Sequence, residues 1–280
     1  MTTAPALAPL RADRASVLRR AILFLLVCAP IWMIPSALGA LHPALLVAMV
    51  LAVTWLFLWT EGRSLAVLGL DASWRRVREL GAGWFGGALL TLVMASLVRV
   101  LLPFPWVRNP AFDATVAASS LLWLLCGNAV EELVFRGYGF ERLIAAIGHW
   151  PAQLATALLF AVFHVVNGWP WPLALLGTTV GSLLFALVFI RWRSVPAAVG
   201  VHAAVNWTRD LLLLDPPTAK TLYAPLAPRP WTSSEQMLAM AVFEGAILVA
   251  CLVLWRSIRR RPPAAVPVWR RDGDPGDASP

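Results

Sequence analysis

Residues 115–136, with the sequence TVAASSLLWLLCGNAVEELVFR, decide the fold class of this chain. The segment is apolar over most of its length and is long enough to cross a bilayer as one helix. Near its end it carries Glu131, Glu132 and Arg136. Ionisable groups are costly inside a membrane, so we expect those found there to be functional. The segment therefore predicts a membrane-spanning helix that holds part of a functional site.

The composition of the whole chain supports the same class. Of its 280 residues, 59% are hydrophobic and 14% are charged, and the mean hydropathy is +0.72. Soluble domains are about a quarter charged and could not bury so much apolar surface. We predict an all-α fold, a polytopic membrane helix bundle of about eight transmembrane helices. The expected spans are 21–41, 43–59, 81–102, 115–135, 151–166, 171–190, 195–214 and 237–255.

The polar segments outside these spans have recognisable patterns. Residues 61–79 mix apolar and basic side chains, which predicts an amphipathic piece at the membrane interface. Residues 136–149 have a helical pattern and are expected to form an elbow sunk in the membrane. The predicted organisation is a cytoplasmic amino-terminal tail (1–20), one transmembrane domain (21–256) and a basic, Pro-rich, disordered cytoplasmic tail (257–280).

Basic residues are distributed unevenly between the two ends of the expected bundle. Eighteen Lys and Arg residues fall on the side of the termini and five on the other. The positive-inside rule therefore places both termini in the cytoplasm, and the Ala-, Arg- and Trp-rich composition suggests a bacterial inner membrane. The net charge of +8 has the same explanation. No nucleic-acid partner is expected, because a basic-aromatic surface is missing from the sequence.

Glu131 and Glu132 are neighbours, so about 100° separates them around a helix and they cannot do the same work. Glu132 and Arg136 are four residues apart, in the order that favours a helical ion pair. Such a pair leaves Glu131 free to point into the bundle. The alternative is that both glutamates form a solvated helix end, although Leu, Val and Phe surround them.

Two further motifs place histidines inside apolar spans. His164 follows Phe160 by four residues, so both lie on one face of a helix. His202 and Asn206 share a face in the same way and can point at one water, metal ion or carbonyl oxygen. Each motif also has a purely structural interpretation, a hydrogen-bonded core histidine for the first and a His–Asn pair that joins two helices for the second.

Taken in order, these three motifs resemble the CPBP family, which includes the CAAX proteases and the bacteriocin-processing or Abi proteins. The resemblance covers about residues 115–214. It implies an intramembrane endopeptidase in which Glu131 activates a water, His164 holds that water, and His202 and Asn206 stabilise the oxyanion. Glu132, Arg136 and Phe160 would support the site.

The resemblance leaves the cofactor open. Glu131, His164 and His202 could form a three-ligand zinc site with an open fourth position, and members of the family have been called both metalloproteases and glutamic-type proteases. We favour the metal-free mechanism, since Glu132 would otherwise have to act as the base and give up Arg136. Zinc stays the alternative.

The substrate and two rival functions also stay open. A protease of this kind would act on a peptide or protein near the membrane and would contact membrane lipid. Its substrate could be a prenylated carboxy terminus, a peptide leader or a carboxy-terminal sorting helix. The rivals are a non-catalytic immunity or scaffold protein, and a proton-coupled transporter, whose relays also use intramembrane Glu and His.

Overall fold

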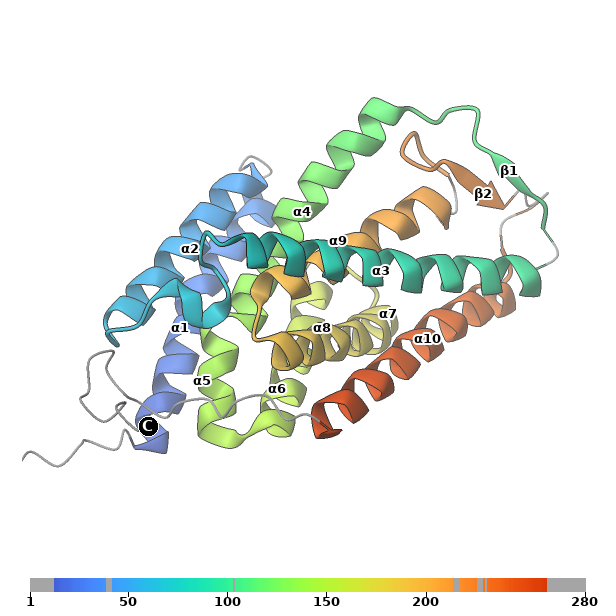
Figure 1. The fold of residues 1–280 in the computed structure, drawn as a ribbon. Coiled ribbons are helices and arrows are strands. Elements are labelled where there is room, and N and C mark those ends of the chain that lie inside the picture. Colours follow the sequence, from blue (N-terminus) through green and yellow to red (C-terminus); the bar gives the residue numbers. More distant parts are fainter. Residues whose placement is uncertain are drawn as a thin grey trace, which may run out of the picture.

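The computed structural model describes residues 13–38, 42–102, 104–213, 217–225, 229 and 231–260, which are helical almost throughout (Figure 1). The elements are α1 (Arg14–Leu38), α2 (Pro43–Trp59), the 3-10 turn η1 (Leu65–Leu68), α3 (Trp74–Leu101), β1 (Trp106–Arg108), α4 (Ala114–Arg136), α5 (Tyr138–Ile147), α6 (His149–Val166), α7 (Trp171–Leu173), the π-helical turn η2 (Ala174–Thr178), α8 (Thr179–Trp192), α9 (Val195–Leu212), β2 (Tyr223–Pro225) and α10 (Ser233–Arg260). The two short strands pair antiparallel.

The helices pack into two buried clusters that share α8 and α9. One cluster joins these helices to α1, α2, α4 and α5, and the other joins them to α3 and α10. In Figure 1, α3 and α10 lie close together near the strands and diverge toward their other ends, with α8 between them. Helices α4 and α9, which carry most of the predicted site residues, pack against each other.

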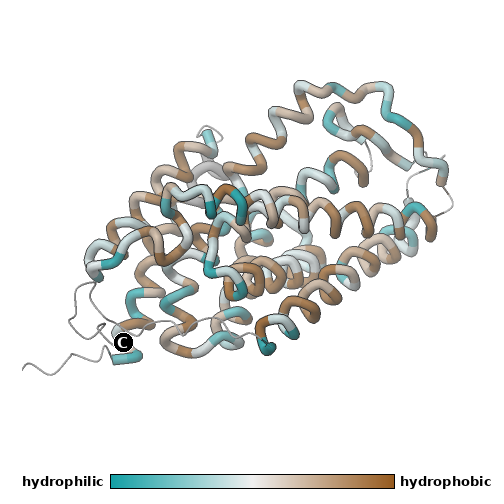
Figure 2. The backbone as a smooth tube through the Cα atoms, viewed as in Figure 1, coloured by the Kyte–Doolittle hydropathy of each residue, from teal (hydrophilic) through white to brown (hydrophobic). Residues whose placement is uncertain are grey.

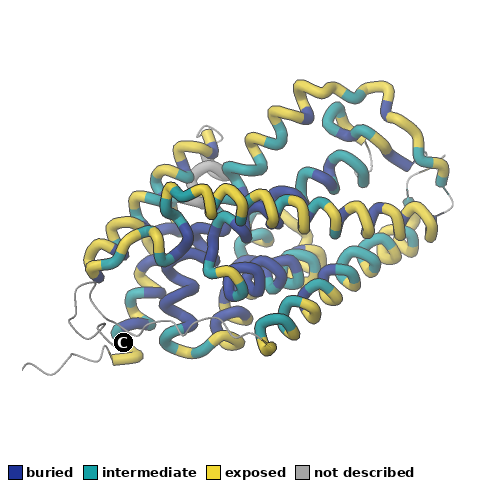
Figure 3. Tube along the Cα trace, viewed as in Figure 1, coloured by how far each residue is buried: buried dark blue, intermediate teal, exposed yellow. Residues whose placement is uncertain are grey.

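Five helical segments among the described residues are long and apolar enough to cross a membrane. Their outer faces carry many exposed apolar residues. Along α3 and α10, the tube includes many hydrophobic residues in Figure 2 and many exposed residues in Figure 3. The predicted all-α membrane bundle is confirmed, and five of its roughly eight expected spans meet this standard. These five are Trp74–Leu101, Ala114–Ile147, His149–Val166, Trp171–Trp192 and Ser233–Arg260.

The other three expected spans are helices of a different kind. Helix α2 is apolar but has only 17 residues. Helix α1 begins at Arg14 and includes Arg19 and Arg20 in its first turns. Helix α9 carries His202 and Asp210, and most of its residues are buried between neighbouring helices. Because protein rather than lipid surrounds α9, its sequence does not need to be uniformly apolar.

The boundaries differ from the prediction at two places. Helix α3 begins at Trp74, so the second part of segment 61–79 forms the first turns of a long helix and is not a separate interfacial piece. An Arg75–Glu79 ion pair of 2.8 Å at the favourable i,i+4 spacing supports this start. Helix α10 continues to Arg260, beyond its expected end near residue 256. The rest of the predicted carboxy-terminal tail, 261–280, and residues 1–12 lie outside the described part of the chain.

The expected elbow is a buried helix of its own, α5, which packs against α1. It is joined to α4 at Gly137, where a Cβ atom would overlap the carbonyl oxygen of Leu133. Glycine therefore permits this junction, through which α5 continues from the acidic end of α4 and packs against α1.

A buried ion-pair network, not foreseen from the sequence, lies next to α5. The fully buried carboxylate of Glu141 accepts hydrogen bonds from Arg63 at 2.7 and 3.0 Å and from Arg193 at 2.8 Å. Glu61 accepts a hydrogen bond from Tyr138 and lies within 3.5 Å of an Arg142 nitrogen. The network ties α5 to the loop after α2 and to the α8–α9 turn. Several of the arginines counted for the positive-inside rule thus also form ion pairs that hold this end of the bundle together.

Glycines allow α3 and α9 to approach closely. A Cβ atom on Gly83 would overlap the carbonyl oxygen of Ala197, one on Gly87 that of Val201, and one on Gly200 that of Leu80. Small residues at such spacing let two membrane helices pack backbone to backbone. This contact fixes α9, and with it His202 and Asn206, against the centre of the bundle.

Candidate active site

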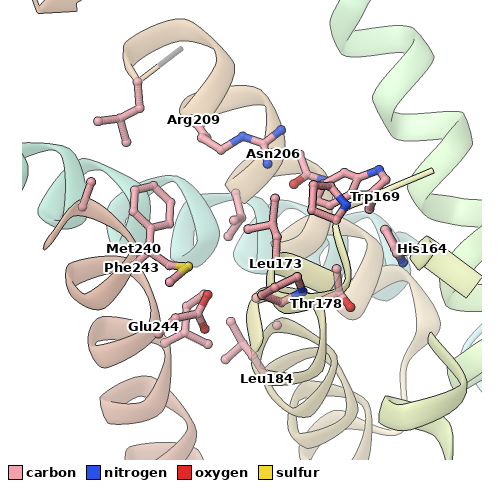
Figure 4. Close-up of a pocket in the computed structure, with 18 of the residues that line it drawn as sticks. His164, Trp169, Leu173, Thr178, Leu184, Asn206, Arg209, Met240, Phe243 and Glu244 are labelled. Carbon is pink, nitrogen blue, oxygen red and sulfur yellow. The ribbon is translucent and has the colours of Figure 1, made fainter. Parts of the chain in front are cut away.

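A cavity of about 760 Å³ lies between α4, α6, η2, α8, α9 and α10. All four residues predicted to be catalytic line it, namely Glu131, His164, His202 and Asn206. Figure 4 shows side chains from several of these helices facing one space, with His164 and Asn206 on one side and Glu244 on the other. Residues that are far apart in the sequence therefore meet in one concave site.

The two adjacent glutamates of α4 point into different surroundings. The side chain of Glu131 is 19% exposed and lines the cavity, whereas that of Glu132 is fully buried behind it. Glu132 accepts a hydrogen bond from Arg136 at 3.1 Å, as the spacing of four residues predicts. The Arg136 guanidinium also donates to the hydroxyl of Ser182 at 2.7 Å and to its carbonyl oxygen at 3.0 Å. Ser182 of α8 thus anchors Arg136, and Arg136 fixes Glu132 in place.

His202 lies between the two carboxylates. Its Nδ1 is 2.8 Å from Oε1 of Glu132, and its Nε2 is 3.6 Å from Oε2 of Glu131. Because Glu132 is paired with Arg136 it is an acceptor, so Nδ1 of His202 carries a proton and donates it. The ring stacks on Phe185 at a centroid distance of 4.0 Å. Its orientation is therefore fixed, with Nε2 toward Glu131.

The other two predicted residues complete one side of the cavity. Nδ1 of His164 lies 2.8 Å from the carbonyl oxygen of Phe160, and since a carbonyl only accepts, Nδ1 is the donor and Nε2 carries the lone pair. Phe160 also contacts the His164 ring and lies under the Arg136 guanidinium at 4.9 Å. Asn206 donates from Nδ2 to Oδ1 of Asn128 at 3.2 Å.

Several residues in or behind the cavity were not predicted as part of the site. Phe185 lines the cavity and Ser182 binds Arg136 behind it; both come from α8, which has no charged or catalytic motif in this part of the sequence. Asn128 lines the cavity one turn before the glutamates. Glu244 lines it from the apolar helix α10, and its Oε2 is buried without a partner among the described residues. Only the last two left a signal in the sequence, because polar groups are unusual in such spans.

Comparison with known proteins is consistent with this geometry. Residues 113–208 match the family model described as Type II CAAX prenyl endopeptidase Rce1-like. The segment includes the three motifs and every residue of the predicted site. No curated protein matches the chain.

Residues 113–208 form an Rce1-like domain of the CPBP family. The resemblance stated from the three motifs is thereby confirmed for this segment, and such a domain implies a protease. The match accounts for α4 to most of α9, while α10, which closes the cavity on its far side, lies beyond it.

The lining of the cavity is uneven along the bundle. We call the end that contains the start of α1, the Arg193 turn and the end of α10 the basic end, and the end that contains β1 and β2 the strand end. The lining residues of α6, α9 and α10 lie mainly toward the strand end, whereas those of α4 reach Glu131 in its carboxy-terminal half.

The possible zinc ligands do not converge. Among the described residues, no three His, Cys, Asp or Glu side chains are close enough together to hold a metal ion. Glu131, His164 and His202 share the cavity, but Nδ1 of His202 is engaged by Glu132 and Nε2 faces a carboxylate. The arrangement does not fit the three-ligand site, so no step of the mechanism below uses a metal.

Proposed function

We propose that this protein is an intramembrane endopeptidase of the CAAX type that hydrolyses a peptide bond with a water activated by Glu131. The observation that carries the proposal is the row Glu131–His202–Glu132–Arg136, which begins in the cavity and ends in a fully buried ion pair. A reactive carboxylate at the surface of a cavity, with a rigid buried support behind it, is the arrangement that general-base catalysis needs.

In this mechanism Glu131 takes a proton from the water as the water attacks the carbonyl carbon, and later passes that proton to the leaving amine. Nε2 of His164 accepts the second hydrogen bond of the water and orients it. Nε2 of His202, carrying a proton in this step, and the amide of Asn206 donate to the oxyanion that forms. Glu132 holds the His202 ring in its orientation, and Arg136 holds Glu132 in place.

We further propose the membrane arrangement. The three helices that do not meet the length and composition standard, α1, α2 and α9, complete eight spans within one domain, residues 21–256. Both termini then lie in the cytoplasm, and a bacterial inner membrane is the expected location. The support is the charge asymmetry of 18 against five Lys and Arg residues.

This arrangement narrows the substrate class. If the basic end is cytoplasmic, the strand end faces the outside of the cell. A mouth of the cavity at the strand end then faces the outside as well. A peptide leader or a carboxy-terminal sorting helix of an exported protein can reach such a mouth, whereas a prenylated carboxy terminus is made in the cytoplasm. We therefore favour an exported substrate that contains a hydrophobic segment, which suits the apolar lining from α8 and α10.

The decisive experiment compares protein termini across the proteome of cells that express the wild type, Glu131→Gln or Glu235→Gln. Glu235 is a matched control, because it lies near the surface and pairs with Arg229. New termini should depend on Glu131 and be unaffected by Glu235→Gln. If Glu131→Gln supports every function of the wild type and no terminus differs, the scaffold alternative is correct. A proton flux that depends on Glu131 without any cleavage would favour the transporter.

A further inference from the structure

A second cavity, of about 640 Å³, lies in the other half of the bundle. Its walls are helical stripes of small and apolar residues from α3, α8, α9 and α10, and it includes Gly86, Val188 and Leu254. Exposed apolar side chains flank it, Phe85 and Leu89 on α3 and Val249 and Val253 on α10. In Figure 1 it corresponds to the region where α3 and α10 diverge over α8. The cavity therefore opens between two faces that are suited to lipid.

One end of this cavity is polar and positively charged. Arg75, Arg78 and Glu79 from the first turns of α3 line it, together with Trp192 at the end of α8. The two carboxylate oxygens of Glu79 are taken by Arg75 and Arg76, each at 2.8 Å. Arg78 makes no hydrogen bond or ion pair with any described residue, so it remains available to an anion from outside the chain. Tryptophan beside arginine is typical of the headgroup level of a membrane.

We propose that this groove binds one anionic phospholipid. The headgroup phosphate lies against Arg78 and Arg75, and an acyl chain runs along the apolar stripe past Gly86. The groove has one positively charged end and an apolar remainder. This combination suits an anionic lipid better than a free anion, which lacks an acyl chain, or a neutral chain, which lacks a charged headgroup. Basic pockets between membrane helices recognise anionic headgroups in this way. The proposal concerns a site distinct from the peptidase cavity, although Leu184 lines both.

Gly86 permits a sharp test, because a Cβ atom there meets nothing within 4 Å and the residue lines the groove. Gly86→Leu therefore adds a side chain that starts in open space and extends into the groove. Gly81→Leu is the matched control, on the same helix and also with nothing within 4 Å, but outside the groove. For the headgroup, Arg78→Gln is compared with Arg99→Gln, at the opposite end of α3.

Binding of phosphatidylglycerol and phosphatidylcholine to the purified protein is measured by native mass spectrometry, so the readout does not depend on protease activity. The wild type should retain phosphatidylglycerol preferentially, and inorganic phosphate should not displace it. Gly86→Leu should abolish this binding. Arg78→Gln should weaken it about five-fold, the effect of about one unit of basic charge near a headgroup. The two control variants should behave as the wild type.

Equal binding of the two lipids by the wild type would overturn the proposal. So would unchanged phosphatidylglycerol binding in Gly86→Leu. Displacement of the lipid by inorganic phosphate would show an anion site without an acyl groove. A neutral farnesylated peptide provides a last comparison. If the protein bound this peptide in a way that Gly86→Leu abolished, and showed no preference for phosphatidylglycerol over phosphatidylcholine, the occupant would be an isoprenoid and the assignment would be wrong.

Discussion

Glu131 and Glu132 differ by one position in the chain and by their whole environment in the fold. Glu131→Gln keeps the shape of the side chain and removes the proposed base. The thermal stability of the Glu131→Gln variant in detergent should match that of the wild type. Its rate of peptide cleavage should fall by about 10²–10⁴-fold. Glu132→Gln instead leaves Arg136 and His202 without their shared carboxylate, and should lower stability by about 3–5 kcal/mol. Equal stability of the two variants would show that the buried pair does not form.

The proposed oxyanion donors should differ in importance. Removal of one such donor costs roughly 10²–10³ in rate. His202→Ala should be at or above this range, because it removes a donor that also contacts both glutamates. Asn206→Ala should be milder, since His202 remains as a donor. Steady-state cleavage of an identified substrate by folded variants measures both, and a larger loss for Asn206→Ala would reverse the assignment.

Among the contacts between individual residues, the sequence could predict those within one helix but not those between helices. The spacing of Glu132 and Arg136 indicates their ion pair, because four residues make one helical turn. The hydrogen bonds from Arg136 to Ser182 and from His202 to Glu132 join residues 46 and 70 positions apart, and no local pattern contains them. The position of His202 between both carboxylates follows only from the packing of α4 on α9.

The close contact between α3 and α9 predicts how glycine substitutions in α3 change the stability of the protein. Gly83→Ala places a methyl group on the carbonyl oxygen of Ala197 and should destabilise the protein by about 1–3 kcal/mol. Gly81→Ala, in the same helix, meets open space and should be neutral or slightly stabilising, since Ala favours helices over Gly. Thermal unfolding of the two variants isolates the packing effect from helix propensity. Similar shifts in both would show that the helices do not approach so closely.

Helix α5 depends on its ion-pair network. Glu141→Gln leaves Arg63 and Arg193 without their carboxylate in a buried place, and breaking such a network should cost about 3–5 kcal/mol. Glu235→Gln, which removes an ion pair at the surface, should change stability far less, because solvent screens it. Thermal unfolding and membrane abundance provide the measurement. Unchanged stability of Glu141→Gln would mean that water already screens these charges.

The helices themselves were largely predictable, since apolar runs of membrane length leave few other structures. Span 43–59 agrees with α2 to the residue, and 171–190 falls within the segment from α7 to α8. The misplaced start of α3 has a physical cause, because Arg75, Arg76 and Glu79 read as interfacial charges and are in fact paired along a continuous helix. The pairing of β1 with β2 left no signal, because three-residue strands are too short to show a period.

For the whole molecule, the proposed orientation can be tested directly. Reporter fusions at Arg271 and within 217–225 should give opposite locations, cytoplasmic for the first and external for the second. In a cysteine-free background, Ser233→Cys at the mouth of the cavity should react with a membrane-impermeant maleimide added to intact spheroplasts. Labelling only after lysis would place the mouth in the cytoplasm and restore prenylated carboxy termini as the favoured substrates.

Helix α10 has a consequence for how the cavity can be reached. It supplies one whole wall, yet only Ile247 and Cys251 are buried along its 28 residues. An element that buries so little has a low free energy of local displacement. The weakest part of the wall is thus also the part that faces lipid. A hydrophobic segment that diffuses within the bilayer can reach Glu131 sideways past α10, so the speed of proteolysis would depend on how easily lipid yields around this one helix.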